Sequence, residues 1–120
     1  MSKKRLERRF NDEVVVVTGG SSGIGRATCV AFAREGAKVI NADIDALNGE
    51  KASRIIRRYR GSGEFMKTDI SSGFEVQTMV TKVLDRHDRV DILVNNASKS
   101  EGNDILEITD IRKLYLKQIT

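Results

Sequence analysis

The sequence has few of the features that mark secreted, metal-binding and membrane proteins. It holds a single cysteine, so an internal disulfide framework and a metal site built from several cysteines are excluded. No apolar run approaches the roughly 18 residues of a membrane span, and the longest aliphatic stretch is only Val14 to Val17. The basic N-terminus lacks the apolar segment of a secretory signal, and proline is absent altogether. We therefore expect a cytoplasmic protein without a membrane partner.

The net charge of +4 is confined to the N-terminus. Residues 1–10 contain five basic side chains against Glu7, whereas the rest of the chain holds 16 basic and 16 acidic residues. A nucleic-acid-binding domain would be expected to carry a basic face of its own. We therefore interpret residues 1–11 as a solvated basic tail and residues 12–120 as the folded domain, and we expect no nucleic-acid partner.

The order of the apolar patterns predicts strands and helices that alternate along the chain. Val14 to Val17 is a continuous β-branched run, which is typical of a strand buried on both faces. Further strands are predicted at 38–42, 64–67 and 90–94, and helices at about 24–36, 46–59, 73–84 and 105–120. This α/β alternation, with right-handed crossovers, favours a Rossmann-like doubly wound parallel sheet of about four strands in the order 3-2-1-4.

The segment between the first strand and the first helix is rich in glycine. Glycines in Thr18–Gly25 permit positive φ angles and the close approach of a diphosphate. The helix N-terminus offers unpaired N–H groups and the positive end of the dipole to that anion. Asp43 follows 18 residues after Gly25, where a carboxylate binds the adenosine ribose hydroxyls and repels a 2′-phosphate. The sequence therefore predicts a dinucleotide site, with NAD preferred over NADP.

With this segment the chain resembles the short-chain dehydrogenase/reductases. Their cofactor turn is Thr-Gly-x-x-x-Gly-Ile-Gly, which Thr18–Gly25 matches in full. Thr68–Ser71 is similar to the family loop that meets the adenine, and Asn95–Ala97 to the Asn-Asn-Ala-Gly segment along the cofactor. The resemblance runs from about residue 12 to the C-terminus. It implies an NAD(P)-dependent oxidoreductase that acts on a small-molecule alcohol or carbonyl compound, and it allows a homo-oligomer.

The resemblance also assigns roles to single residues. It implies that Asp43 meets the ribose and that Asp69 and Ile70 meet the adenine. The residues that it places at the diphosphate are Gly19, Gly23, Ile24 and Gly25. Thr18 would tie the first turn to the loop after the fourth strand. The residues that we expect at the cofactor are Thr18, Gly19, Ser21, Ser22, Gly23, Ile24, Gly25, Asp43, Ile44, Asp69, Ile70, Asn95, Asn96 and Ala97.

The chain departs from the family pattern at the residues that carry catalysis. The family uses a Tyr-x-x-x-Lys pair, in which the lysine lowers the pKa of the tyrosine that transfers the proton. Here Tyr59 is followed four residues later by Gly63, and Tyr115 by Ile119. Ser98 also stands where the family motif has glycine. We therefore assign no catalytic residue and expect the cofactor-binding half alone, because a six- or seven-stranded sheet would need a chain about twice as long.

A truncated sheet leaves two other interpretations open. The fourth strand would become an uncovered apolar edge, which favours pairing or aggregation. In the first interpretation, the chain is a non-catalytic module that binds a nucleotide or a partner. In the second, it is a non-functional remnant that does not fold stably by itself.

The remaining candidate residues have simpler interpretations. Cys29 is expected to be a small helix residue, because a reactive thiol needs a basic neighbour. His87 fits the polar end of a helix. The spacing of Asp85, Asp88 and Asp91 suits a solvated connection better than a metal site, and we expect no bound metal.

Overall fold

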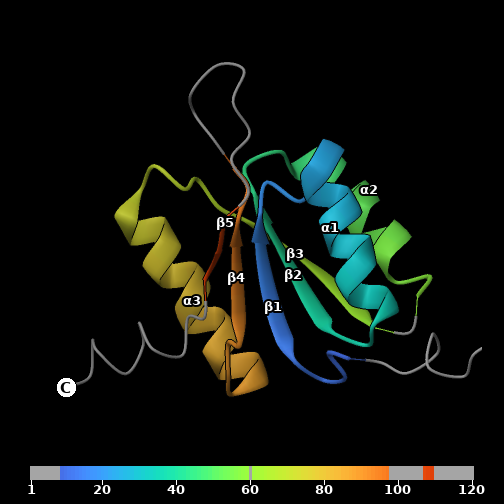
Figure 1. Cartoon of the computed structure of the whole chain (residues 1–120). Helices are drawn as coiled ribbons and strands as arrows, with labels where there is room; N and C mark the ends of the chain where they lie inside the picture. Colours follow the sequence, from blue (N-terminus) through green and yellow to red (C-terminus); the bar gives the residue numbers. More distant parts are fainter. Residues whose placement is uncertain (1–8, 60, 98–106, 110–120) are drawn as a thin grey trace, which may run out of the picture.

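A computed structural model describes residues 9–59, 61–97 and 107–109 of the chain. It contains one sheet with the strand order β3-β2-β1-β4-β5 (Figure 1). The strands are β1 (Val14–Thr18), β2 (Lys38–Asp43), β3 (Ser62–Lys67), β4 (Ile92–Asn95) and β5 (Glu107–Thr109). The helices are α1 (Gly23–Arg34), α2 (Ala46–Ile56) and α3 (Gly73–His87). Helices α1 and α2 cover one face of the sheet and α3 covers the other (Figure 1).

The expected parallel sheet of four strands in the order 3-2-1-4 is confirmed. β1 pairs in parallel with β2 and β4, and β2 pairs in parallel with β3. The largest differences in strand boundaries are at the starts of β3 and β4, which begin at Ser62 and Ile92, two residues from the expected positions. The elements that set the topology are those that the apolar pattern predicts.

The expectation of a helix from residue 105 onward is wrong at Glu107–Thr109. These residues form β5, which pairs antiparallel with β4 so that Val94 lies opposite Ile108. β4 is therefore paired on both sides and is not the uncovered edge that we expected. A strand of three residues is too short for its own periodicity to reveal it. The other residues of the expected helix, 105–106 and 110–120, lie outside the described part of the chain, as does Ser98.

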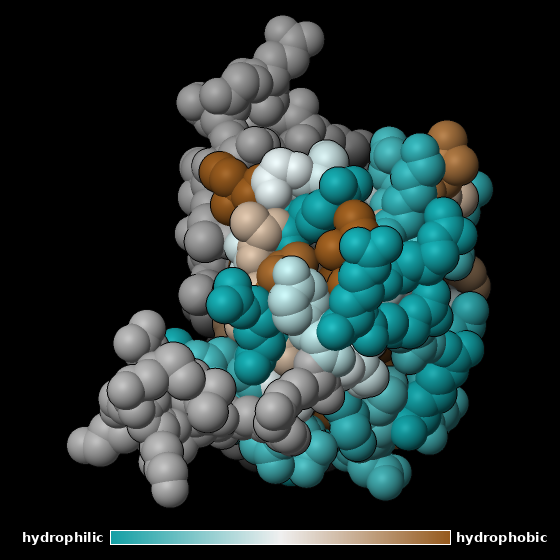
Figure 2. Space-filling model, turned by 90° about the vertical axis from the view of Figure 1, so that its right-hand side faces the viewer, coloured by the Kyte–Doolittle hydropathy of each residue, from teal (hydrophilic) through white to brown (hydrophobic). Residues whose placement is uncertain are grey.

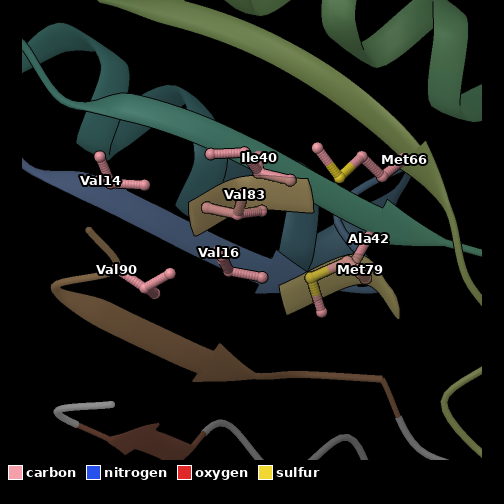
Figure 3. Close-up of a cluster of buried hydrophobic side chains, with 8 residues drawn as sticks. All are labelled: Val14, Val16, Ile40, Ala42, Met66, Met79, Val83 and Val90. Atoms are coloured by element: carbon pink, nitrogen blue, oxygen red, sulfur yellow. The ribbon is translucent and has the colours of Figure 1, made fainter. Parts of the chain in front are cut away.

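The core consists of two apolar layers, one on each side of β1. All five residues of β1 are buried, and alternate side chains point to opposite faces. Val14 and Val16 belong to the layer under α3, where Met79 and Val83 pack against the strands (Figure 3). Val15 and Val17 belong to the layer under α1 and α2. The outer surface on the α1–α2 side is mainly hydrophilic, with hydrophobic residues in small separate groups (Figure 2).

Asp91 has a structural role that the sequence interpretation missed. Its side chain is completely buried, so its interpretation as part of a solvated connection is wrong. One carboxylate oxygen accepts a hydrogen bond from the backbone N–H of Val14 at 2.8 Å. The other accepts from the Arg89 guanidinium at 2.6 Å. A buried carboxylate is tolerated when it is paired and hydrogen-bonded in this way, and here it fixes the start of β1 beside β4.

Within the described residues, no helix has the length and apolar character needed to cross a membrane.

We expect the layer under α2 to be sensitive to loss of volume at Ile56. This side chain is fully buried, and its Cγ2 atom lies only 2.6 Å from where a Cβ on Gly63 would be. Ile56→Ala should lower the free energy of unfolding by about 2–5 kcal/mol, through lost burial and a cavity. Urea unfolding followed by circular dichroism measures this loss.

Leu47→Ala on the same helix is the matched control. Leu47 is 69% exposed, so its truncation should change the free energy of unfolding by no more than about 0.5 kcal/mol. Equal losses in the two variants would show that α2 does not pack on the sheet as described.

Candidate functional site

A cavity of about 320 Å³ lies at the carboxyl ends of the four parallel strands. This is the edge of an open α/β sheet where ligands bind, and the loops after β1 and β4 flank the point where the strand order reverses. Its volume lies at the lower end of the range of small-molecule sites. The cavity is lined by Gly19, Ser22, Ala42, Asp43, Ile44, Thr68, Asp69, Ile70, Asn96 and Ala97.

Eight of the fourteen expected cofactor residues line this cavity, and six do not. Among the six, Thr18 and Ser21 are buried next to it. Ile24 is 52% exposed outside it, whereas Gly25 is buried in the first turn of α1. The six residues outside the lining are Thr18, Ser21, Gly23, Ile24, Gly25 and Asn95. Ala42 and Thr68 line the cavity although the sequence interpretation did not include them.

Thr18 joins the end of β1 to the loop after β4, as the resemblance implied. Its hydroxyl accepts hydrogen bonds from the backbone N–H groups of Asn96 at 3.0 Å and Ala97 at 3.1 Å. It donates to the carbonyl oxygen of Val94 at 3.3 Å. One buried hydroxyl thus fixes one wall of the cavity relative to the glycine turn.

Asn96 strengthens the same connection. Its Nδ2 atom donates to the carbonyl oxygen of Gly19 at 3.0 Å. Its Oδ1 atom is buried and has no hydrogen-bond partner within the described part of the chain. A buried acceptor without a partner costs about 1–3 kcal/mol, so a bound group that donated to this oxygen would be favoured.

Gly25 lets α1 approach the glycine turn closely. A Cβ atom at this position would lie 2.0 Å from the carbonyl oxygen of Gly19 and 2.5 Å from Nδ2 of Asn96. No side chain fits at those distances. Gly19 itself has a φ of +68°, a conformation that glycine adopts at low cost. The two glycines therefore place the first turn of α1 against the end of β1.

Three successive backbone N–H groups of the turn are bonded to β2. Gly19 N–H donates to the Ala42 carbonyl oxygen at 2.9 Å, and Gly20 N–H to Oδ1 of Asn41 at 2.8 Å. Ser21 N–H donates to Oδ2 of Asp43 at 3.2 Å. Asn41 is fully buried and was missed by the sequence interpretation. The signal that could have identified it is a polar residue in the middle of an apolar strand.

The carboxylate of Asp43 is held at the wall of the cavity by two backbone amides. Oδ2 accepts from Ser21 N–H, and Oδ1 accepts from Asp45 N–H at 3.2 Å. The carboxylate of Asp69 is used differently, because its Oδ1 accepts from the backbone N–H and the hydroxyl of Ser71 at 2.9 and 2.6 Å. Asp43 therefore provides a fixed negative charge to the site, whereas Asp69 shapes the loop that leads into α3.

The N-terminus of α1 differs from those of the other two helices. In α2 and α3, the side chains of Asp45 and Ser72 cap the helix by accepting from the backbone N–H groups of Asn48 and Glu75. The N-cap of α1 in the described chain, Ser22, makes no such side-chain bond. Like α2, α1 has no acidic residue in its first turn. An anion is favoured at such an end, because the helix dipole and free N–H groups point toward it.

Cys29 lies under the turn and is not a nucleophile. Its side chain is fully buried, and its sulfur lies 3.9 Å from the carbonyl oxygen of Gly20. Burial, and to a lesser extent the negative charge of Asp43, raises the pKa of the thiol to about 12. The thiol therefore stays protonated near neutral pH and packs as a small apolar residue in the layer under α1 and α2.

Comparison with known proteins relates the chain to one enzyme family. The family model described as short chain dehydrogenase matches residues 13–115. Cyclopentanol dehydrogenase of Comamonas sp. (strain NCIMB 9872) is 37% identical over 119 residues, which cover 90% of this chain and 47% of that protein. Levodione reductase of Leifsonia aquatica is 38% identical over 91 residues, which cover 74% of this chain and 34% of that protein.

Solved structures agree with this relationship. NAD⁺-bound xylitol dehydrogenase superposes with a TM-score of 0.73 at 29% identity, over 78% of this chain and 36% of that chain. A short-chain type dehydrogenase/reductase from Mycobacterium ulcerans gives a TM-score of 0.74 at 28% identity, over 77% and 34%. The chain thus spans 47% of the length of the cyclopentanol dehydrogenase and 34% to 36% of the other three proteins.

We expect Gly25→Ala to disrupt the site. The added Cβ must push α1 away from the carbonyl oxygen of Gly19, and overpacking of this kind costs about 1–3 kcal/mol or more. Gly73→Ala is the matched control, because nothing lies within 4 Å of a Cβ at that first position of α3. By helix propensity it should gain up to about 1 kcal/mol. Chemical unfolding of both variants compares them, and equal stability would contradict the close approach of α1.

We expect the thiol of Cys29 to be protected in the folded chain. At pH 8 a thiol-specific colorimetric reagent should label the folded chain at least about a hundredfold more slowly than the chain in urea. Because folding raises this pKa from 9.0 to about 12, ionisation favours the unfolded state. The stability contributed by the neutral thiol is complete below about pH 9 and is lost as the pH rises toward 12. Labelling at equal rates in the folded and unfolded chains would show that the turn does not cover this residue.

Proposed function

The chain belongs to the short-chain dehydrogenase family, and we propose that it forms the NAD-binding part of an oxidoreductase that acts on an alcohol or a carbonyl compound. The observation that carries this proposal is the carboxylate of Asp43, fixed by two backbone amides at the wall of the cavity. The chain spans 47% of the length of the cyclopentanol dehydrogenase. The oxidoreductase activity, which belongs to a whole enzyme, is therefore also a proposal.

The adenosine half of the cofactor would be held at the ends of β2 and β3. The ribose hydroxyls donate hydrogen bonds to Asp43, whose charge repels a 2′-phosphate. The adenine would lie against the loop of Asp69 and Ile70, which lines the same cavity. This arrangement supports NAD as the preferred cofactor over NADP.

The diphosphate would lie at the N-terminus of α1. The backbone amides from Ser22 to Gly25 would bind this anion without competition from a capping side chain or from an acidic residue in the first turn of the described helix. The amides of Gly19, Gly20 and Ser21 already bond to β2 and shape the turn instead. The side chain of Ser21 is buried and supports the turn from below.

When bound, NAD supplies the hydride chemistry, and the residues of this chain bind and orient it. A proton must also move in the reaction, and the family uses the tyrosine of Tyr-x-x-x-Lys for that step. These 120 residues contain no such pair. We propose that the chain binds the cofactor by itself and that turnover depends on a tyrosine and a lysine outside it. The cytoplasmic location, the homo-oligomer and the boundary at residue 12 stay predictions.

We expect the chain to bind NADH more tightly than NADPH, as measured by parallel calorimetric titrations. Asp43→Asn should shift the ratio of the two affinities toward NADPH by at least about tenfold, because it removes the charge that repels the 2′-phosphate.

Asp45→Asn is the control for this prediction. It removes a carboxylate two residues away, and asparagine remains a good N-cap for α2, so the affinity ratio should stay unchanged. Equal shifts in both variants would argue for a general charge effect. Failure of the unaltered chain to bind either dinucleotide would reject the proposed function and favour an interaction module or a non-functional remnant.

A further inference from the structure

Asn41 is a polar residue in an apolar position of the sheet. Side chains of β2 alternate between the two layers, so Val39, Asn41 and Asp43 share the face toward α1 and α2. Val39 belongs to the apolar layer on that face. Asn41 is completely buried beside it, under the glycine turn. Placing an amide there is tolerated only because both of its ends are hydrogen-bonded.

The orientation of the Asn41 amide follows from its partners. A backbone N–H can only donate, so the atom that faces Gly20 N–H at 2.8 Å is the oxygen. The Nδ2 atom then faces the hydroxyl oxygen of Ser21 at 3.1 Å and donates to it. Asn41 thus binds two successive residues of the turn, one through its backbone and one through its side chain.

Ser21 connects Asn41 to the carboxylate of Asp43 by two hydrogen bonds. Its side chain is 1% exposed and bonded to Asn41, while its backbone N–H donates to Oδ2 of Asp43 at 3.2 Å. The turn also lies tightly on Asn41, because a Cβ on Gly20 would come within 2.7 Å of Oδ1. A displacement of the turn would therefore move the amide that orients the Asp43 carboxylate.

We propose that Asn41 is a positioning residue for cofactor preference. It holds Gly20 and Ser21 so that Ser21 N–H fixes the Asp43 carboxylate where it accepts from a ribose and repels a 2′-phosphate. Asn41 is buried below the turn and acts through Ser21. This inference rests on the proposed function, since it concerns selection between NADH and NADPH at the same site.

The test compares Asn41→Ala with Val39→Ala by titration with NADH and NADPH. Both residues are buried on the same face of β2, so both variants lose stability. Asn41→Ala should weaken NADH binding about tenfold and reduce the NADH-to-NADPH affinity ratio by at least about threefold, since displacement of Ser21 leaves Asp43 with only one of the two amides that orient it. Val39→Ala should leave that ratio within about twofold, because it removes only apolar contacts.

A double-mutant cycle separates positioning from a general effect on stability. If Asn41 acts through Asp43, then adding Asn41→Ala to Asp43→Asn should leave the affinity ratio as it is in Asp43→Asn alone. Ser21→Ala breaks the link to Asn41 but keeps the backbone amides, and it should lower the ratio in the same direction. If Asn41→Ala does not fold, the affinity ratio of Ser21→Ala tests the role of Asn41 instead.

The titrations distinguish failure of the proposed function from failure of the role of Asn41. If the unaltered chain binds neither dinucleotide, the proposed function fails and this inference falls with it. If it prefers NADH and Asn41→Ala or Ser21→Ala keeps that preference, only the role of Asn41 is overturned. Full additivity in the double variant overturns it as well.

Discussion

The close approach of α1 to the end of β1 is the constraint on which the rest of the site depends. Gly25 lies where any Cβ would meet the carbonyl oxygen of Gly19, so the helix packs directly on the turn. This contact places the uncapped N-terminus of α1 next to the cavity. It also brings the turn within reach of Asn96, whose side chain bonds to Gly19. The position of the α1 N-terminus and that of the wall after β4 thus both depend on this contact.

The glycine turn is held mainly by its neighbour β2. A turn rich in glycine has high conformational entropy in the unfolded chain, and ordering it is costly. Three hydrogen bonds from successive amides to Asn41, Ala42 and Asp43 offset that cost. β2 therefore orders the turn and also carries Asp43. The conformation of the turn and the position of the Asp43 carboxylate depend on the same strand.

Local patterns predicted the parts of the fold and site that depend on neighbours in the sequence. The alternating apolar patterns, such as the run of valines in β1, predicted the order of the sheet, and the glycine turn predicted the place of the cavity. Asn41 and Asp91 were missed or misread because their roles come from partners far away in the sequence, Gly20 and Val14. β5 was missed because its pairing with β4, and not its own three residues, defines it as a strand.

The construction of the cavity links ligand binding to the stability of the whole sheet. Its lining comes from the ends of all four parallel strands or the loops that follow them, so the folded arrangement of every strand is needed for the site to exist. A ligand that binds only the folded state stabilises it in proportion to the logarithm of its concentration over its dissociation constant. A dinucleotide bound in this cavity would therefore stabilise the arrangement of the four strands that form it. Binding and folding would then be linked equilibria in this chain, and a mutation that destabilises the sheet would also weaken the apparent affinity for the dinucleotide.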